Sequence, residues 1–154
     1  MQNLPHLIHQ LESKIAHCET TNLAISGGSV GWHIEHSLKT IDQIVTACKK
    51  SNPKTYQWKF NLNRLFILDL LNKIPRGKAK APKIVHPEGE ITMNSLVVHL
   101  EKVKENLNYW NDLNKNAFFP HPYFGNLNKK STEKFLVVHT NHHLMIINDI
   151  LKTN

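Results

Sequence analysis

Cysteine is scarce in this chain of 154 residues. The two cysteines, Cys18 and Cys48, lie far apart in the sequence and belong to no C-x-x-C pattern. Both fall on the apolar stripes of expected helices, where a free thiol behaves as a small hydrophobic side chain. We therefore predict two buried, reduced thiols rather than a disulfide or a catalytic cysteine.

Arginine is equally rare, although the formal net charge is +7. A positive charge raises the question of a nucleic-acid partner. Arginine, however, makes most base-edge and bidentate phosphate contacts, and only Arg64 and Arg76 are present. The lysines are scattered, and no helix-turn-helix, zinc-finger or RNP pattern occurs. We expect a solvated, lysine-rich surface and no nucleic-acid partner.

Long apolar runs are missing as well. No run approaches the roughly 18 residues of a membrane span. The first residues, "MQNLPHLIHQ", lack the basic and apolar regions of a signal peptide. We therefore expect a cytoplasmic protein with no membrane partner, and the length fits one compact domain over residues 1–154.

The apolar residues that are present recur with a helical period, and no segment shows convincing strand alternation. The pattern predicts an all-α fold, a four-helix bundle in which a long crossover joins the second and third bundle helices. Residues 75–90 belong to that crossover, because three prolines and two glycines exclude regular structure there. The four long helices are expected at about 4–18, 29–50, 91–113 and from 128 almost to the end, with a short extra helix at 62–74 and a loop at 116–127.

The last helix carries histidines in an apolar setting, within "FLVVHTNHHLMII". At about 100° per residue, His139 and His143 lie about 40° apart at the centre of the core-facing stripe, and His142 lies near its edge. Two buried imidazoles need partners or lose roughly 1–3 kcal/mol. They could be core histidines bonded to neighbouring groups, but the i, i+4 spacing also presents two nitrogens to one metal ion. We favour the metal and place His142 beside it.

An open metal site usually has three protein ligands, so another helix must supply the third. The second helix offers His33 and His36 in "GWHIEHSLK", and the third bundle helix offers His99. Helical periodicity does not separate these three histidines, and on this ground they remain equal candidates.

Two stretches resemble a known family. "HPYFGNLNKKSTEKFLVVHTNHHLMI" is similar to the signature H-P-x-F-G-x-L followed by H-x-x-H-H-L in an uncharacterised subfamily of the DinB/YfiT-like superfamily. "SVGWHIEHSL" resembles the other superfamily landmark, a histidine about two turns into the second helix. The resemblance covers nearly the whole chain and implies a four-helix bundle with a divalent metal, nickel or zinc. Carried over by position, the metal ligands are His36, His139 and His143.

The chain departs from the superfamily pattern at two positions. Ile146 stands where a glutamine is usual, three residues after the last ligand, and Thr132 stands where a tryptophan is common. A missing polar neighbour implies altered control of the metal, a different substrate or reduced activity.

The chemistry follows from the ligand type. Three neutral imidazoles leave the charge of the metal uncompensated, so it can activate a bound water, thiolate or carbonyl. The resemblance implies a hydrolase or thiol S-transferase that attacks a small electrophile with water or a low-molecular-weight thiol, and a possible homodimer. A non-catalytic bundle that is stabilised by a metal or binds a small molecule is the alternative.

Further site candidates lie close to these histidines in the sequence. The loop before the last helix could form a wall of the pocket. An aromatic plug with a turn at Gly125 is an equally good interpretation of the same residues. The candidates for proton transfer are His142, His121 and Glu35, and those for substrate binding are Tyr123, Phe124 and Trp32.

Overall fold

The computed structural model describes residues 3–77 and 83–152, which form helices and one small sheet. No helix in these two ranges is long and apolar enough to cross a membrane. The α-helices are α1 (Leu4–Glu12), α2 (Val30–Lys50), α3 (Leu62–Arg64), α4 (Met93–Asn108) and α5 (Lys129–Lys152). Short helical turns are η1 (Ile15–His17), η2 (Pro53–Thr55), η3 (Leu65–Leu71) and η4 (Lys83–Val85), and the strands are β1 (Phe118–His121) and β2 (Gly125–Asn128).

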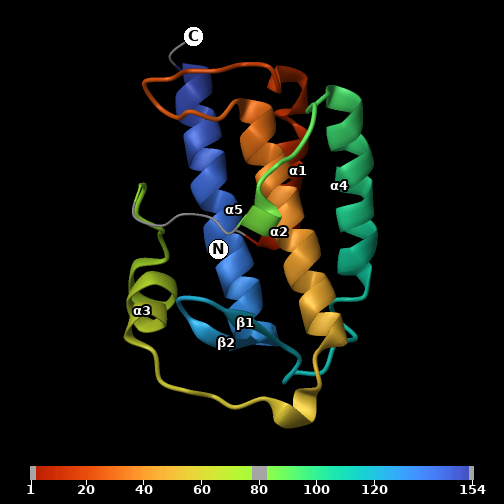
Figure 1. The fold of residues 1–154 in the computed structure, drawn as a ribbon, viewed down its shortest axis with the longest axis vertical. Helices are drawn as coiled ribbons and strands as arrows, with labels where there is room; N and C mark the ends of the chain where they lie inside the picture. The colour runs from red at the N-terminus through yellow and green to blue at the C-terminus, as the bar shows by residue number, and fades with distance from the viewer. Residues whose placement is uncertain (1–2, 78–82, 153–154) are drawn as a thin grey trace.

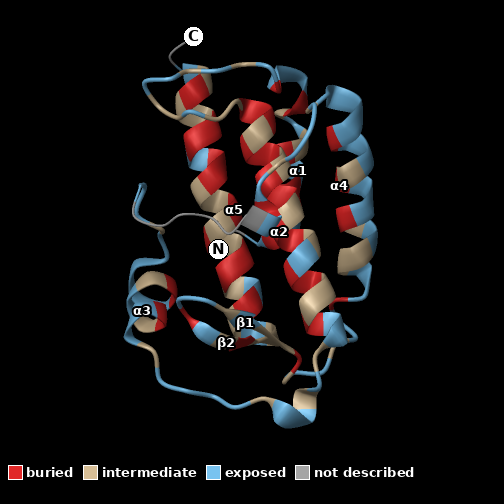
Figure 2. Cartoon of the chain, viewed as in Figure 1, coloured by how far each residue is buried: buried red, intermediate tan, exposed pale blue. Residues whose placement is uncertain are grey.

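The longest helices pack side by side. Helix α2 contacts both α4 and α5, and α1 contacts α5. The crossover between α2 and α4 returns the chain to the end where α2 began, so α2 and α4 run in the same direction and α5 runs opposite to them (Figure 1). Buried residues line the inner faces of these helices (Figure 2). This arrangement brings the N-terminal half of α2 beside the C-terminal half of α5.

Strands β1 and β2 form an antiparallel hairpin, so the all-α prediction is wrong. Phe118 pairs with Asn128, and His121 pairs with Gly125. Gly125 has a φ of 69°, a conformation that favours glycine and closes short hairpin loops. The hairpin packs against α2 and α5, where the sequence predicted only a loop.

Three helices begin within one residue of the predicted positions 4, 29 and 128. The side chains of Asn3, Ser29 and Asn128 accept hydrogen bonds from the backbone N–H groups of the first turns of α1, α2 and α5. Helix α1, however, ends at Glu12 and gives way to η1 instead of continuing to Cys18.

The crossover contains a helix of unusual geometry. The short helix predicted over 62–74 is a single α-turn, α3, followed by the π-helical η3, and Asn72 ends it with a left-handed φ of 48°. Leu68 and Arg64 are buried, but several apolar side chains of residues 58–71 are exposed. The exposed ones are Trp58, Phe60, Leu62, Phe66, Leu70 and Leu71.

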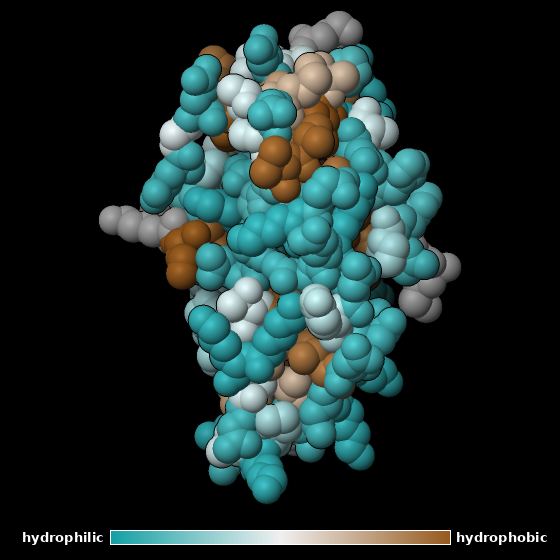
Figure 3. Space-filling view, turned by 90° about the vertical axis from the view of Figure 1, so that its right-hand side faces the viewer, coloured by the Kyte–Doolittle hydropathy of each residue, from teal (hydrophilic) through white to brown (hydrophobic). Residues whose placement is uncertain are grey.

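Helix α4 is shorter than the predicted 91–113. It begins at a capping box in which Thr92 and Ser95 bond each other's backbone N–H groups, and it ends at Asn108. The face of the molecule on the α4 side is mostly hydrophilic, with only separate hydrophobic groups (Figure 3). Three residues of α4, Leu96, Leu100 and Val103, are buried in the core.

Candidate metal centre

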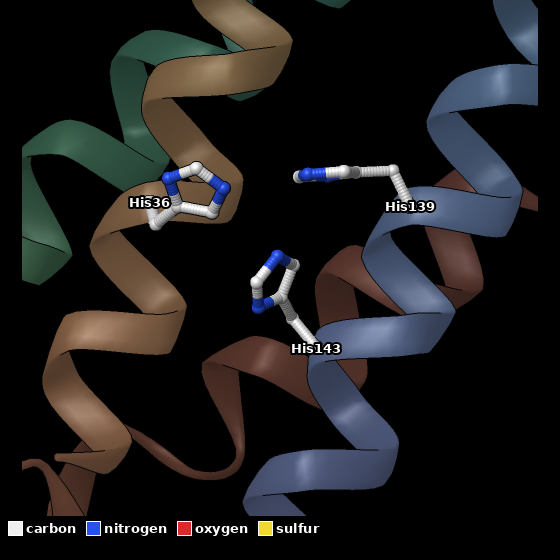
Figure 4. A group of neighbouring side chains, drawn as sticks. All are labelled: His36, His139 and His143. Atoms are coloured by element: carbon white, nitrogen blue, oxygen red, sulfur yellow. The ribbon is translucent and has the colours of Figure 1, made fainter. Parts of the chain in front are cut away.

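Three histidines from two helices meet in the interior. His36 of α2 lies opposite His139 and His143 of α5, and one nitrogen from each ring lies within 4.8 Å of the other two. The ring centroids are 4.7 Å apart for His36 and His143, 4.7 Å for His139 and His143, and 5.2 Å for His36 and His139. Figure 4 shows the three side chains turned toward a common space between the helices. The cluster could hold a metal ion.

Local helix geometry places the members of this cluster. His139 and His143 are four residues apart, so they project from successive turns of α5 on one face. His36 lies two turns into α2, whose start is fixed by the Ser29 cap. Because α2 and α5 pack against each other, these two faces meet.

The ring of His36 is held on two sides. Its Nδ1 atom lies 2.8 Å from the backbone carbonyl oxygen of Val85, in η4 of the crossover. The Trp32 ring stacks on the imidazole at a centroid distance of 5.1 Å and an interplanar angle of 7°. A carbonyl oxygen can only accept, so Nδ1 carries the proton and Nε2 keeps its lone pair. That is the protonation state a metal ligand needs.

The ring of His143 contacts another histidine. Its Nδ1 atom lies 2.9 Å from Nδ1 of His33, and Nε2 of His33 lies 2.9 Å from the hydroxyl of Ser26. The hydroxyl oxygen of Ser26 also accepts a hydrogen bond from the backbone N–H of Gly28 at 3.1 Å. His33 therefore lies behind the cluster and not in it.

The third ring, that of His139, lacks such a support. Its Nδ1 atom is buried and has no hydrogen-bond partner among the described residues, although the residue as a whole is half-buried. Buried polar atoms in folded proteins nearly always have a partner. An unsatisfied nitrogen within a group of three imidazoles is what a metal-binding cluster presents, so the residues fit a metal ion.

Burial also keeps these rings uncharged. It lowers the pKa of His36, and it holds the pKa of His139 and His143 well below the ordinary value, helped by the charges of the neighbouring histidines. Burial likewise lowers the pKa of His33 to about 4. Neutral imidazoles have free lone pairs at pH 7, and a divalent cation bound by them would keep its full positive charge.

The remaining candidate for the third ligand lies elsewhere. His99 of α4 bonds the carboxylate of Glu35 through its Nδ1 atom at 2.9 Å. Of the three candidates that periodicity left equal, His36 is the one that forms a cluster with both His139 and His143, whereas His33 bonds His143 from behind. Glu35, a candidate for proton transfer, is engaged with His99 on the side of α2 that faces α4.

His142 lies beside the cluster but outside it. Its ring meets that of His143 edge to face at a centroid distance of 5.1 Å. It lines a cleft with Lys73, Ile74 and Arg76 of the crossover. Burial lowers the pKa of His142, and Arg76 lowers it further.

The candidates in the hairpin loop pack among themselves. Nδ1 of His121 accepts hydrogen bonds from the backbone N–H groups of Tyr123 and Phe124 at 3.1 and 3.2 Å, and its ring stacks on that of Phe124 at 4.3 Å. Phe135 separates this group from the cluster by contacting both His121 and His139. The catalytic role of His121 and the substrate-binding roles of Tyr123, Phe124 and Trp32 stay predictions.

The two departures from the superfamily pattern occupy the interior. Ile146 belongs to the hydrophobic core, and the buried hydroxyl of Thr132 donates to the backbone carbonyl of Leu127 at 2.9 Å.

Both cysteines are buried and free, as predicted, and burial raises the pKa of Cys48 to about 11.

Two contributors to the site carried no signal that sequence reasoning could use. The group of Val85 that bonds His36 is a backbone carbonyl, so no side-chain pattern marks it. Ser26 lies in a glycine-containing loop whose sequence indicates only the end of one helix and the start of the next. His33 was a candidate, but as a ligand and not as the partner of one.

Fold and site together define a helical protein with a small hairpin and a buried cluster of three histidines that could hold a metal ion. Residues 32–149 match the profile of a family described as a protein of unknown function, DUF1569. The chain belongs to that family, and the matched region includes all three clustered histidines. Comparisons with curated proteins and with solved structures gave no match.

Proposed function

We propose that His36, His139 and His143 bind a divalent metal ion, nickel or zinc, and that the protein is a metal-dependent enzyme. The proposed reaction is the attack of water or a low-molecular-weight thiol on a small electrophile, as in a hydrolase or a thiol S-transferase. The observation that carries the proposal is the convergence of three neutral ring nitrogens within 4.8 Å from two packed helices. Imidazole suits both metals.

The residues around the cluster support this function through charge and orientation. A divalent metal, when bound, would lower the pKa of water or a thiol and polarise a carbonyl. Val85 and Trp32 fix the ring of His36, and no carboxylate belongs to the cluster of described residues. The three ligands would therefore leave the positive charge of the ion available to an anionic nucleophile.

His142 is the best placed of the candidates for proton transfer. It contacts His143 and also lines the cleft beside the crossover. Lys73 and Arg76 line the same cleft and make its surroundings positive. In the proposed enzyme His142 moves a proton between the nucleophile and solvent.

A relationship with the DinB/YfiT-like superfamily belongs to this proposal. Its support is the set of residues that resemble the superfamily: one histidine from the second long helix and a pair at i, i+4 on the last, here His36 with His139 and His143. The low-molecular-weight thiol and the homodimer follow from the same relationship.

Metal analysis of the purified protein tests the site. We expect about one equivalent of divalent metal in the wild type after loading with Zn²⁺ or Ni²⁺, and loss of most of it in His139→Ala and His36→Ala, because two imidazoles bind weakly. His142→Ala is the matched control on the same helix and keeps its metal. Wild-type protein that takes up no stoichiometric metal would disprove the site.

Activity measurements test the enzyme. Metal-loaded protein is incubated with chromogenic esters, and with thiols plus alkylating electrophiles, and compared with chelated protein and with His139→Ala. We expect turnover of at least one class that is lost on chelation and restored by adding the metal. Stoichiometric metal without metal-dependent turnover of any class would favour a non-catalytic role.

A metal that only stabilises the fold is the second candidate, and burial favours it. His36 is 2% exposed and His143 is 7% exposed, which leaves little access for a substrate. In that case the metal raises the free energy of unfolding, as structural ions do, and no substrate changes its surroundings. A shift in the spectrum of bound Co²⁺ or Ni²⁺ on adding a thiol would argue against a closed site.

A further inference from the structure

A chain of hydrogen bonds runs from the cluster to the loop before α2. It links His143 to His33 at 2.9 Å and His33 to Ser26 at 2.9 Å. His33 is 3% exposed and His143 is 7% exposed, so water does not compete strongly for these nitrogens. A hydrogen bond between two buried imidazoles is strongly directional, because only one of the two facing nitrogens carries a proton.

The direction of this chain decides whether His143 can bind a metal. A neutral imidazole has one N–H, and the two facing Nδ1 atoms lie 2.9 Å apart, so one of them donates and the other accepts. If His143 donates from Nδ1, its Nε2 lone pair is free. His33 then carries its proton on Nε2 and donates a hydrogen bond to the hydroxyl of Ser26. If His33 donates instead, the proton of His143 lies on Nε2 and blocks the nitrogen that would face the metal.

We propose that His33 is a positioning residue that accepts a hydrogen bond from Nδ1–H of His143 and so keeps the Nε2 lone pair of His143 directed at the metal. The inference rests on the proposed function of the cluster. It gives His143 the partner that Val85 gives His36, since metal-bound histidines almost always donate their other N–H to a neighbour. Here that neighbour is a second imidazole from the helix that also supplies a ligand.

The position of His33 is itself fixed by its surroundings. The Trp32 ring meets the His33 ring edge to face at 5.1 Å and 84°. Ser26 is held in turn by the N–H of Gly28, whose close contact with Trp32 leaves no room for a side chain. A serine oxygen has two lone pairs, so it can accept from Gly28 and His33 together. These contacts are compatible with the direction in which His33 donates to Ser26.

Variants of His33 with and without an acceptor test this role. His33→Leu fills similar space without an acceptor, and His33→Gln supplies an amide oxygen. We expect Zn²⁺ affinity, measured by competition with a chromophoric chelator, to fall about 10–100-fold in His33→Leu, the range found for such supporting partners. His33→Gln restores part of it. The control His99→Leu removes a histidine that bonds Glu35 and leaves the affinity unchanged.

Nuclear magnetic resonance of the metal-free protein gives an independent readout. Nitrogen-15 shifts of the His143 ring are expected to show the Nδ1–H tautomer in the wild type, and a shift toward the Nε2–H tautomer in His33→Leu. Ser26→Ala, at a half-exposed position, is expected to shift the tautomer balance of His143 less. This variant replaces His33→Leu in the test if His33→Leu does not fold. The Nε2–H tautomer in the wild type, or wild-type Zn²⁺ affinity in folded His33→Leu, would overturn the proposal. Failure of the wild type to bind metal would instead refute the proposed function, and the tautomer would still report on His33.

Discussion

The Nδ1 atom of His36 lies 2.8 Å from the carbonyl oxygen of Val85, which connects the second helix to the crossover that follows it. Because a carbonyl cannot donate, the contact fixes the tautomer of a buried ring without the help of a charged group. It also means that part of the crossover supports the cluster, since η4 packs on α2.

The first prediction concerns this tautomer. In the metal-free protein, His36 is expected as the Nδ1–H form, with a nitrogen-15 shift of Nε2 that is typical of an unprotonated nitrogen. The exposed His17 supplies an internal reference in which both tautomers exchange. An Nε2–H resonance for His36 would mean that the bond to Val85 does not form in solution.

The second prediction concerns metal-dependent stability. At a metal concentration 100 times the dissociation constant, binding to the folded state alone adds about 2.7 kcal/mol to the free energy of unfolding. For a chain of this size this corresponds to a rise of about 5–10 °C in Tm. Thermal unfolding followed by circular dichroism checks it.

In this experiment His139→Ala loses the rise in Tm and His142→Ala keeps it. The comparison matters because the two histidines lie on the same helix and differ in whether they face the cluster. Equal loss in both variants would show that His142 also holds the metal, and an unchanged rise in His139→Ala would show that the metal binds outside the three histidines.

Helical periodicity was sufficient to find two of the three clustered histidines. His139 and His143 share one helix, so their relation depends only on the local geometry of that helix. The choice of His36 over His33 and His99 depends on how α2 is rotated against α5, which is a tertiary property. Both His33 and His36 are buried, and only the packing decides that His36 meets both rings of the pair while His33 bonds His143 from behind. Resemblance, and not periodicity, selected His36.

The fold shows the same difference between features that local sequence determines and features that depend on tertiary packing. Long helices such as α2 were predictable because their apolar stripes extend over many turns. The hairpin was not, because each strand has four residues and Pro120 lies inside one of them. Its closure depends on the φ of Gly125 and on the hydrogen bonds that His121 accepts, neither of which appears as strand alternation.

The third prediction concerns acid stability. Burial lowers the pKa of His121 from 6.5 to about 4, so the unfolded chain takes up this proton at a higher pH than the folded protein. The free energy of unfolding therefore falls as the pH drops from 6.5 toward 4, and the part due to His121 is about 3 kcal/mol at most. Urea unfolding at several pH values measures this slope.

His121→Asn separates that part from the other histidines. The asparagine oxygen can accept from the N–H groups of Tyr123 and Phe124 without titrating, as in turns that asparagine commonly forms. We expect a variant with a shallower loss of stability between pH 6.5 and 4 than the wild type. An unchanged slope would assign the acid sensitivity to the cluster and not to the hairpin loop.

The fourth prediction concerns Ile146, the position where the resemblance implies a glutamine. The isoleucine is 8% exposed and packs in the hydrophobic core, so Ile146→Gln buries an amide without a partner and costs about 1–3 kcal/mol of unfolding free energy. Ile146→Met is the matched control, because methionine has nearly the shape of glutamine and no hydrogen-bonding amide, and such swaps usually cost less than about 1.5 kcal/mol. Urea unfolding of both variants gives the difference due to polarity alone. If Ile146→Gln is as stable as Ile146→Met, the amide has found a partner near His143, and the position is then open to the polar role that the resemblance implies.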